Sequence, residues 1–271
     1  LRRALEPSPL PDIDCSAAEP ALTVSVTNAA QLTPELLAYR PARVYLPLEL
    51  FETMTGLPPA DTEWCAVLPR IWRDGDEAHL RELLERAKAL GVTGAALDNL
   101  GHFPLVAGTG LTLCGDFGLN VFNSHALAFL KGKGLQSACA SFELRAAQLR
   151  DLKKVLPVEA IVYGRLPLMV TENCLISNSA GCRCDRTNFL CDRTGAKFPL
   201  LPVFGHRTEV QNSKVLYLGD REDYRQLGLT YARLRFTTES PTECVRVFHS
   251  YLERGDAPEE FTRGLFDRGV E

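Results

Sequence analysis

The sequence predicts an α/β fold, a TIM-like (β/α)8 barrel with a cysteine-rich insertion after the seventh strand. Eight short apolar runs recur along the chain without strict alternation, as in strands that are buried on both faces of a parallel sheet. Segments with a helical period lie between several of these runs, which is typical of a barrel built from strand–helix units. An open, doubly wound sheet is the alternative. However, we find no glycine-rich nucleotide-binding motif that would support it.

Each predicted strand is a run of five to eight residues, and most are rich in Val, Leu, Ile, Tyr or Cys. Most are bounded by Pro, Gly, Asn or Asp, the residues that favour turns. The eight predicted strands span residues 22–26, 43–48, 64–71, 93–100, 111–117, 137–142, 159–164 and 231–237.

The predicted helices span residues 76–91, 124–134, 142–157 and 241–255. The first has the clearest apolar stripe, and Gly91 supplies its stop. Asn123 and Ser141 precede the second and third helices as capping residues, and Pro157 ends the third.

Composition indicates an ordinary globular protein of 271 residues, 45% hydrophobic and 24% charged, with a net charge of −4. A mildly acidic total argues against a dedicated nucleic-acid coat, although a local basic patch can still bind anions. No apolar run approaches the ~18 residues of a membrane span, so no membrane insertion is expected. We also find no signal peptide, and we expect a cytoplasmic protein with reduced thiols.

The first 20 residues are rich in Pro and polar residues and resemble a linker. The sequence therefore predicts two parts: residues 1–20, a linker from a larger protein, and residues 21–271, the barrel domain. An N-terminal domain of the same longer protein is an expected partner.

In a barrel, functional side chains follow the carboxyl ends of the strands. Arg165 follows the seventh strand directly, and we expect it to point into the barrel mouth and bind an anion. Glu143 either carries a first-turn charge on the third helix or acts as a general acid or base. Asn120 and Asn123 either cap or close turns or contribute to the site. The predicted catalytic residues are Arg165, Glu143 and Asn120, and the predicted substrate-binding residues are Asp98, Asn99, Asp116, Asn123, Glu172 and Arg193.

The stretch ENCLISNSAGCRCDRTNFLCDRTGAKFPL, residues 172–200, holds four of the nine cysteines without an apolar period. In a cytosolic chain such a cluster favours a metal or redox site over disulfides. The candidate ligands in this stretch are Cys174, Cys182, Cys184 and Cys191. Their spacing is neither that of a zinc ribbon nor that of a ferredoxin, so iron–sulfur, zinc and a metal-free thiol loop all stay open.

Residues 182–214 contain six basic and three acidic side chains, a positive balance within an acidic chain. A positive rim beside a redox centre would favour an anionic substrate, such as RNA or a small dicarboxylate. The alternative is that these arginines pair with neighbouring carboxylates.

Five segments together resemble one family: VYGRLPLMVTENCLI, CDRTGAKFPL, RTEVQNSKVLYLGDR, GDFGLNVFNSHALAFL and EFTRGLFDRGV. They are similar to the catalytic region of peptidase family U32, the collagenase-like proteins, over roughly residues 20 to 271. Some members are described as proteases. Other relatives hydroxylate RNA bases or the ubiquinone ring without oxygen, carry a four-iron four-sulfur cluster on four cysteines, and are linked to prephenate as the hydroxyl source.

The resemblance implies a cluster on Cys174, Cys182 and Cys184. The fourth family cysteine has His206 in its place, within Gly205-His206-Arg207. Imidazole replaces thiolate on the iron of Rieske centres, so His206 is one candidate fourth ligand and Cys191 is the other. The loss of the cluster is the third possibility, and zinc is the alternative metal.

The resemblance and the thiols together favour an iron–sulfur-dependent, oxygen-independent hydroxylase acting on an RNA base or a similar substrate. The first alternative is a cysteine-type or unclassified collagenase-like peptidase, which requires a thiolate and a positioned histidine. The second alternative is a non-catalytic RNA- or protein-binding module in which the basic loop binds the partner.

Overall fold

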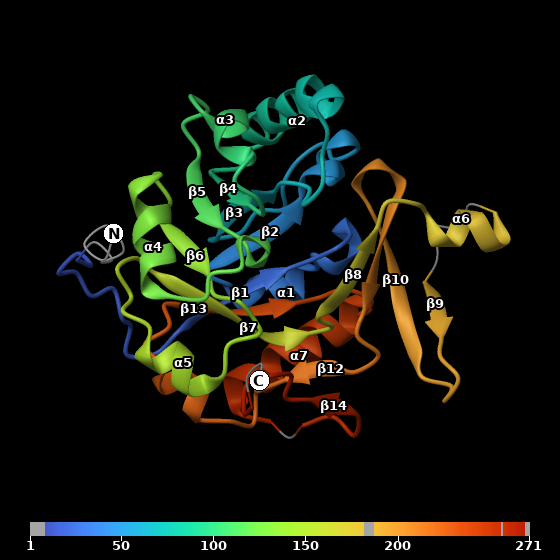
Figure 1. Cartoon of the computed structure of the whole chain (residues 1–271). Coiled ribbons are helices and arrows are strands. Elements are labelled where there is room, and N and C mark those ends of the chain that lie inside the picture. Colours follow the sequence, from blue (N-terminus) through green and yellow to red (C-terminus); the bar gives the residue numbers. More distant parts are fainter. Residues whose placement is uncertain (1–8, 182–186, 256, 269–271) are drawn as a thin grey trace, which may run out of the picture.

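Eight parallel strands close into a barrel in the computed structural model, which describes residues 9–181, 187–255 and 257–268 (Figure 1). Each strand pairs with the next in parallel, and the last strand pairs with both the first and the seventh. These are the eight strands that the sequence predicts, so the prediction of a (β/α)8 barrel is confirmed. The barrel strands are β1 (Ala21–Ser25), β2 (Arg43–Pro47), β3 (Glu63–Val67), β4 (Gly94–Leu97), β5 (Thr112–Gly115), β6 (Ser137–Cys139), β7 (Val158–Gly164) and β13 (Tyr231–Arg235).

Several observed strands end earlier than predicted. β3 ends at Val67 rather than residue 71, so Arg70 lies in the loop after the strand. β5 ends at Gly115 rather than residue 117. Each shortened strand leaves a polar loop at its carboxyl end, and these loops form one rim of the barrel.

The seam between β7 and β13 depends on a glycine. Gly164 has a φ of +126°, and a Cβ atom there would lie 2.2 Å from the carbonyl oxygen of Arg235. A side chain at this position would therefore both strain the backbone and separate the two strands that close the barrel.

Helices cover the outside of the barrel unevenly. The longest are α2 and α7, with 13 residues each, and no helix among the described residues is long and apolar enough to cross a membrane. After β2 the chain forms only a 3-10 turn. The helices are α1 (Pro34–Ala38), α2 (Glu77–Ala89), α3 (His102–Val106), α4 (Ser124–Gly132), α5 (Ala146–Asp151), α6 (Leu175–Ala180) and α7 (Pro241–Glu253), with 3-10 helices η2 (Ala29–Gln31), η3 (Leu48–Glu52), η4 (Asp74–Asp76), η5 (Phe117–Leu119), η6 (Phe204–His206) and η7 (Asp223–Gln226).

The helix predicted over residues 142–157 is much shorter in the structure. α5 covers only Ala146–Asp151, because residues 142–144 form a turn and the Lys154 ammonium binds the carbonyl oxygens of Leu149 and Leu152. The carbonyl groups at the end of the helix therefore have a side-chain partner, and the helix ends at Asp151. Glu143 consequently lies in the turn and does not open the helix.

Between β7 and β13, no helix within the described residues covers the barrel. The chain instead forms a separate antiparallel sheet in the order β8-β11-β10-β9, with α6 packed against it (Figure 1). Its strands are β8 (Pro167–Thr171), β9 (Asn188–Cys191), β10 (Lys197–Val203) and β11 (Arg207–Gln211). The chain then returns to the barrel through β12 (Val215–Tyr217), which pairs with β7 and with β14 (Phe261–Thr262).

Candidate functional site

A cavity of about 970 Å³ lies at the carboxyl end of the barrel, between the strand ends and the small antiparallel sheet. The loops after β1, β3, β4 and β5 line one side, and residues of β10, η6 and β11 line the other. This is the face of a (β/α)8 barrel on which ligands bind. Its volume suits a small organic molecule or a single extruded base.

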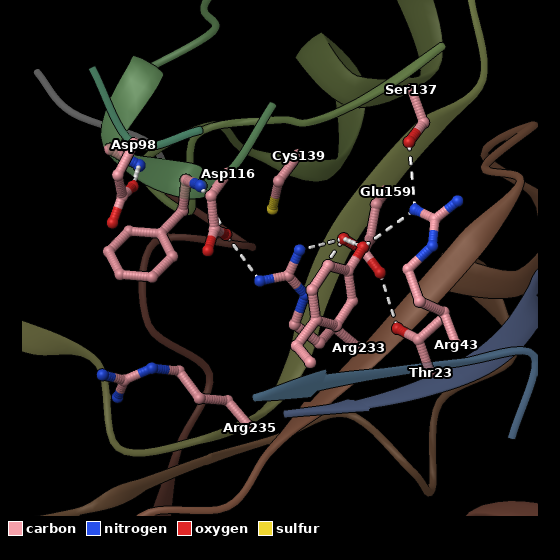
Figure 2. A network of polar contacts seen from close by, with 12 residues as sticks. Thr23, Arg43, Asp98, Asp116, Ser137, Cys139, Glu159, Arg233 and Arg235 are labelled. Carbon is pink, nitrogen blue, oxygen red and sulfur yellow. Dashed lines mark hydrogen bonds and ion pairs between the residues drawn. The ribbon is translucent and has the colours of Figure 1, made fainter. Parts of the chain in front are cut away.

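The floor of the cavity is an ionic network inside the barrel. Arg233 of β13 pairs with Asp116 at 2.5 Å on one side and with Glu159 on the other (Figure 2). Its guanidinium lies 3.8 Å from the centre of the Tyr45 ring. All three charged side chains are at most 2% exposed, so the network is held away from water.

Glu159 is the centre of this network. Thr23 and Tyr45 donate hydrogen bonds to it at 2.6 and 2.9 Å. Burial opposes its ionisation, but Arg233, Arg43 and these donors outweigh burial and lower its pKa. Because its acceptors are already occupied, we assign the floor to the structural frame of the barrel.

Arg43 extends the network toward the amino end of the barrel. It donates to Glu63 at 2.8 Å, and to the hydroxyls of Tyr45 and Ser137 at 3.0 Å each. The barrel interior is thus crosslinked by hydrogen bonds from both ends.

A second group of charges lies at the mouth. Arg235 donates to Glu209 and Gln211, at 2.7 Å each, and to the carbonyl oxygen of Arg165 at 2.5 Å. Arg70 approaches the other oxygen of Glu209 at 3.5 Å, and its side chain is 37% exposed. Arg70 therefore has less pairing than Arg233 or Arg235 and can turn its guanidinium toward an anion in the cavity.

Phe117 lies between the two mouth arginines. The guanidinium carbons of Arg70 and Arg235 are each 5.5 Å from the centre of its ring. This cation–π arrangement gives the cationic side of the cavity a fixed apolar support.

Asp98 borders the same cavity and is 6% exposed. Its Oδ1 accepts a hydrogen bond from the backbone N–H of Gly118 at 2.6 Å, and its own N–H donates to Nδ1 of His102 at 3.1 Å. Burial, followed by the nearby Asp116, raises the pKa of Asp98 well above its ordinary value. Burial also lowers the pKa of His102 to about 4, which keeps that imidazole neutral.

Of the predicted substrate-binding residues, Asp98 and Asp116 border the cavity. Asn99 lies behind it, donating to the carbonyl oxygen of Arg70 at 2.9 Å. Glu172 is exposed and pairs with Arg207 and then Arg73, which together lower its pKa to about 2.

The remaining predicted polar residues lie away from the cavity lining. Asn123 caps α4 through a 2.9 Å hydrogen bond from Ala126, and Asn120 is an exposed left-handed residue after η5. Glu143 lies in the turn before α5, and Arg193 is exposed beyond β9. The geometry of the two asparagines matches the capping alternative, and the catalytic roles predicted for Asn120 and Glu143 stay predictions.

Arg165 does not point into the barrel mouth as expected. It is absent from the cavity lining, and its Nη1 donates to the carbonyl oxygens of Asn212 and Ser213. Its backbone carbonyl nevertheless anchors Arg235, which occupies the mouth in its place. The reason is geometric: Arg165 follows the turn at Gly164, where the chain leaves the barrel for β8.

Two of the candidate metal ligands, Cys174 and His206, border the cavity. One end of β9 is nearer the cavity, because Asn188 there pairs with Leu200, which lines the cavity. Cys191 is exposed at the end away from the cavity, where it pairs with Lys197. Cys182 and Cys184 lie outside the described residues. Within the described residues, no group of three or more His, Cys, Asp or Glu side chains is arranged to hold a metal.

Sequence reasoning missed Arg233, Arg235 and Glu159 of the barrel interior. A signal for them exists: Arg233 and Arg235 are two apart in an otherwise apolar strand, so both face the same side, and Glu159 opens another apolar strand. Charges within buried strands are rarely tolerated unless they are paired, which predicts partners inside the barrel. Arg70 and Glu209 carried no comparable signal.

The model of peptidase family U32 matches residues 49–188, slightly more than half of the chain. The chain belongs to peptidase family U32. The matched region contains β3 to β8, and hence both Asp98 and Asp116 and the part of the cysteine-rich stretch up to residue 188. No curated protein matches the chain.

Solved structures of low identity are similar to parts of this member of the U32 family. The U32 peptidase Mk0906 is 11% identical, with a TM-score of 0.46 over 85% of this chain and 98% of the other. A structure described as the copper homeostasis protein CutC from Streptococcus agalactiae is 12% identical, with a TM-score of 0.40 over 52% of this chain and 87% of the other. A structure described as a deoxyribose-phosphate aldolase from Coccidioides immitis is 11% identical, with a TM-score of 0.35 over 57% and 76%.

Proposed function

We propose that this U32 family member is an iron–sulfur-dependent enzyme that hydroxylates an anionic substrate, an RNA base or a similar molecule, without oxygen, by exchanging its hydrogen for the hydroxyl group of a small dicarboxylate, as the family resemblance implies. The observation that carries the proposal is that Cys174 and His206 border the same cavity as Asp98 and Arg70. Side chains that can bind a metal and side chains that can bind a substrate thus border one cavity at the carboxyl end of the barrel.

The donor set fits a four-iron four-sulfur cluster held by Cys174, Cys182, Cys184 and His206. Thiolates are soft ligands that suit cluster iron, and imidazole can replace one of them. The position of Cys191 favours His206 as the fourth ligand. Asn188 pairs with Leu200 beside the cavity, and Cys191 lies three residues, about 10 Å, further along β9. When bound, the cluster would supply the electron transfer of the reaction.

The protein's own residues would bind and orient the substrate. Within the described chain, Arg70 has one long ion pair, to Glu209, and is the group available to an anion such as an RNA phosphate or a dicarboxylate. Arg235 is anchored by three acceptors and would contribute positive potential rather than a movable ligand. The paired network under Arg233 would keep the floor rigid while substrate binds.

Anaerobic purification followed by iron, sulfide and zinc analysis and a visible absorption spectrum tests this proposal. We expect about four irons and four sulfides per chain with broad visible absorption. His206→Ala should lose most of the iron, whereas Cys191→Ala, the matched control, should retain it.

Each other outcome contradicts a stated part of the proposal. Iron lost from Cys191→Ala but kept in His206→Ala would make Cys191 the fourth ligand. Stoichiometric zinc would indicate a structural or hydrolytic centre instead. A metal-free protein after anaerobic reconstitution would contradict an iron–sulfur enzyme altogether.

A cysteine peptidase is the second candidate, because the cavity brings a thiol, Cys174, and an imidazole, His206, to one surface. Peptide cleavage by metal-free protein, abolished in both Cys174→Ser and His206→Gln, would favour it over the hydroxylase. Cleavage that survives either substitution would exclude this pair as the catalytic groups.

A further inference from the structure

Asp98 is a buried acid in the cavity without a cationic partner. Its Oδ1 accepts the 2.6 Å hydrogen bond from Gly118, and across the described residues neither an ion pair nor a hydrogen bond reaches its Oδ2. The approach of Gly118 is close: a Cβ atom at that glycine would lie 2.2 Å from Oδ1. One oxygen is therefore fixed against the backbone, and the other is left for the cavity.

The neighbouring charges are already committed to one another. Asp116 pairs with Arg233, and Glu209 pairs with Arg235. Figure 2 shows Asp116 turned toward Arg233, with Asp98 outside that pair. The charged or titratable groups around Asp98 are Arg70 after β3, Asp116 after β5, Cys139 on β6, Glu209 on β11 and His102 on α3.

The two neighbouring acids, Asp98 and Asp116, lie in different surroundings. Asp116 has an arginine at 2.5 Å, whereas Asp98 has only backbone contacts within the described chain, and its burial and Asp116 outweigh the more distant charge of Arg70. Burial and the neighbouring Asp116 together therefore favour the protonated form of Asp98. The neutral imidazole of His102 accepts from the Asp98 N–H, and its other nitrogen lies 3.1 Å from the carbonyl oxygen of Pro69, so it adds no positive charge.

We propose that Asp98 keeps its proton at neutral pH and donates a hydrogen bond from Oδ2 to an oxyanion that Arg70 binds in the cavity. Gly118 holds Oδ1 as the acceptor, which leaves the hydroxyl at Oδ2. Arg70 would supply the charge and Asp98 a neutral donor, so the pair would recognise an anionic oxygen without adding a second positive charge. The inference rests on the proposed function only in taking this cavity as the substrate site.

A protonated donor makes anion binding depend on pH. A ligand that accepts a hydrogen bond from the protonated carboxyl of Asp98 is bound only while that carboxyl keeps its proton. Its affinity falls about tenfold per pH unit above the pKa of Asp98 in the folded protein. Asn at this position keeps an N–H donor at every pH, and so removes this decline.

The test uses sulfate as the probe, because sulfate does not change its charge between pH 5 and 9. Sulfate affinity is measured by calorimetry across this range for the wild type, Asp98→Asn, Asp98→Ala, Arg70→Gln and the surface control Arg150→Gln. We expect the affinity of the wild type to fall with pH, Asp98→Asn to lack this fall, and Asp98→Ala and Arg70→Gln to bind at least tenfold more weakly at pH 6. The control should match the wild type.

His206 also borders the cavity and is present in both the wild type and Asp98→Asn. The readout is therefore the difference between these two proteins in how steeply sulfate affinity changes with pH. Equal slopes, or no saturable sulfate binding in the wild type, would overturn the inference. Infrared difference spectra give an independent check: the carbonyl band of a protonated carboxyl should be present at pH 7 in the wild type and absent in Asp98→Asn. Its absence from the wild type would also overturn the inference.

Neither measurement requires iron. A protein that fails the metal analysis can still show the Asp98 proton and the sulfate site, and a protein that carries a cluster can lack both. The two proposals therefore fail separately.

Discussion

The floor and the mouth of the barrel are both rich in arginine and acid, but they differ in pairing. On the floor, Arg233 contacts Asp116, Glu159 and the face of Tyr45, and it is 1% exposed. At the mouth, Arg70 has one ion pair at 3.5 Å and Asp98 has none in the described chain. Complete pairing indicates a structural role, whereas an incompletely paired group beside a cavity is a candidate for ligand binding.

The largest expected effect is on the floor. Arg233→Met leaves two buried carboxylates, Asp116 and Glu159, without their common partner, and should lower the free energy of unfolding by about 3–5 kcal/mol. Denaturant unfolding at pH 7 measures this, with Arg150→Met as the exposed control. A loss equal to that of the control would mean that the floor does not hold the barrel together.

The next effect tests the barrel seam beneath both regions. Gly164→Ala places a Cβ atom 2.2 Å from the Arg235 carbonyl oxygen at a positive φ, and we expect a loss of about 1–3 kcal/mol. The matched control is Gly132→Ala on α4, where a Cβ atom meets nothing within 4 Å. That change should stabilise the protein slightly, by less than about 1 kcal/mol. Equal responses would contradict the close approach of β7 and β13.

Asp98→Asn should affect stability in a pH-dependent way. The folded protein keeps the Asp98 proton, but the unfolded chain releases it above about pH 4. The unfolded state then binds fewer protons, so stability in the wild type is lost as the pH rises from about 4 toward the folded-state pKa, by at most about 1.4 kcal/mol per pH unit. Asp98→Asn lacks this loss, and its stability relative to the wild type should be higher at pH 8 than at pH 5. Urea titrations measure the free energy of unfolding of both proteins at the two pH values. The same difference between Asp98→Asn and the wild type at pH 5 and at pH 8 would contradict a protonated Asp98.

The smallest effect is expected at the mouth. Arg70→Gln removes a cation that is 37% exposed and pairs only at 3.5 Å, so stability should change by no more than about 0.5 kcal/mol. The same unfolding measurement compares it directly with Arg233→Met. A loss as large as that of the floor variant would place Arg70 in the structural frame and remove the contrast between the regions.

The site was only partly predictable. Asp98 and Asp116 were found because they directly follow apolar strands, and the carboxyl ends of parallel strands meet at one rim. Arg165 follows a strand in the same way, but its side chain binds the carbonyls at residues 212 and 213. Sequence position gives the end of a strand, whereas the turn at Gly164 sets the direction of the next side chain.

The sequence by itself determined the eight strands and the helices α2, α4 and α7, because apolar runs and 3.6-residue stripes are local patterns that require burial on particular faces. Only the tertiary structure decided which charges are paired. Arg233 reaches Asp116 across 117 residues, and Arg70 reaches Glu209 of the small sheet across the mouth. No local pattern encodes such contacts, because they depend on how the barrel closes and where the small sheet packs against it.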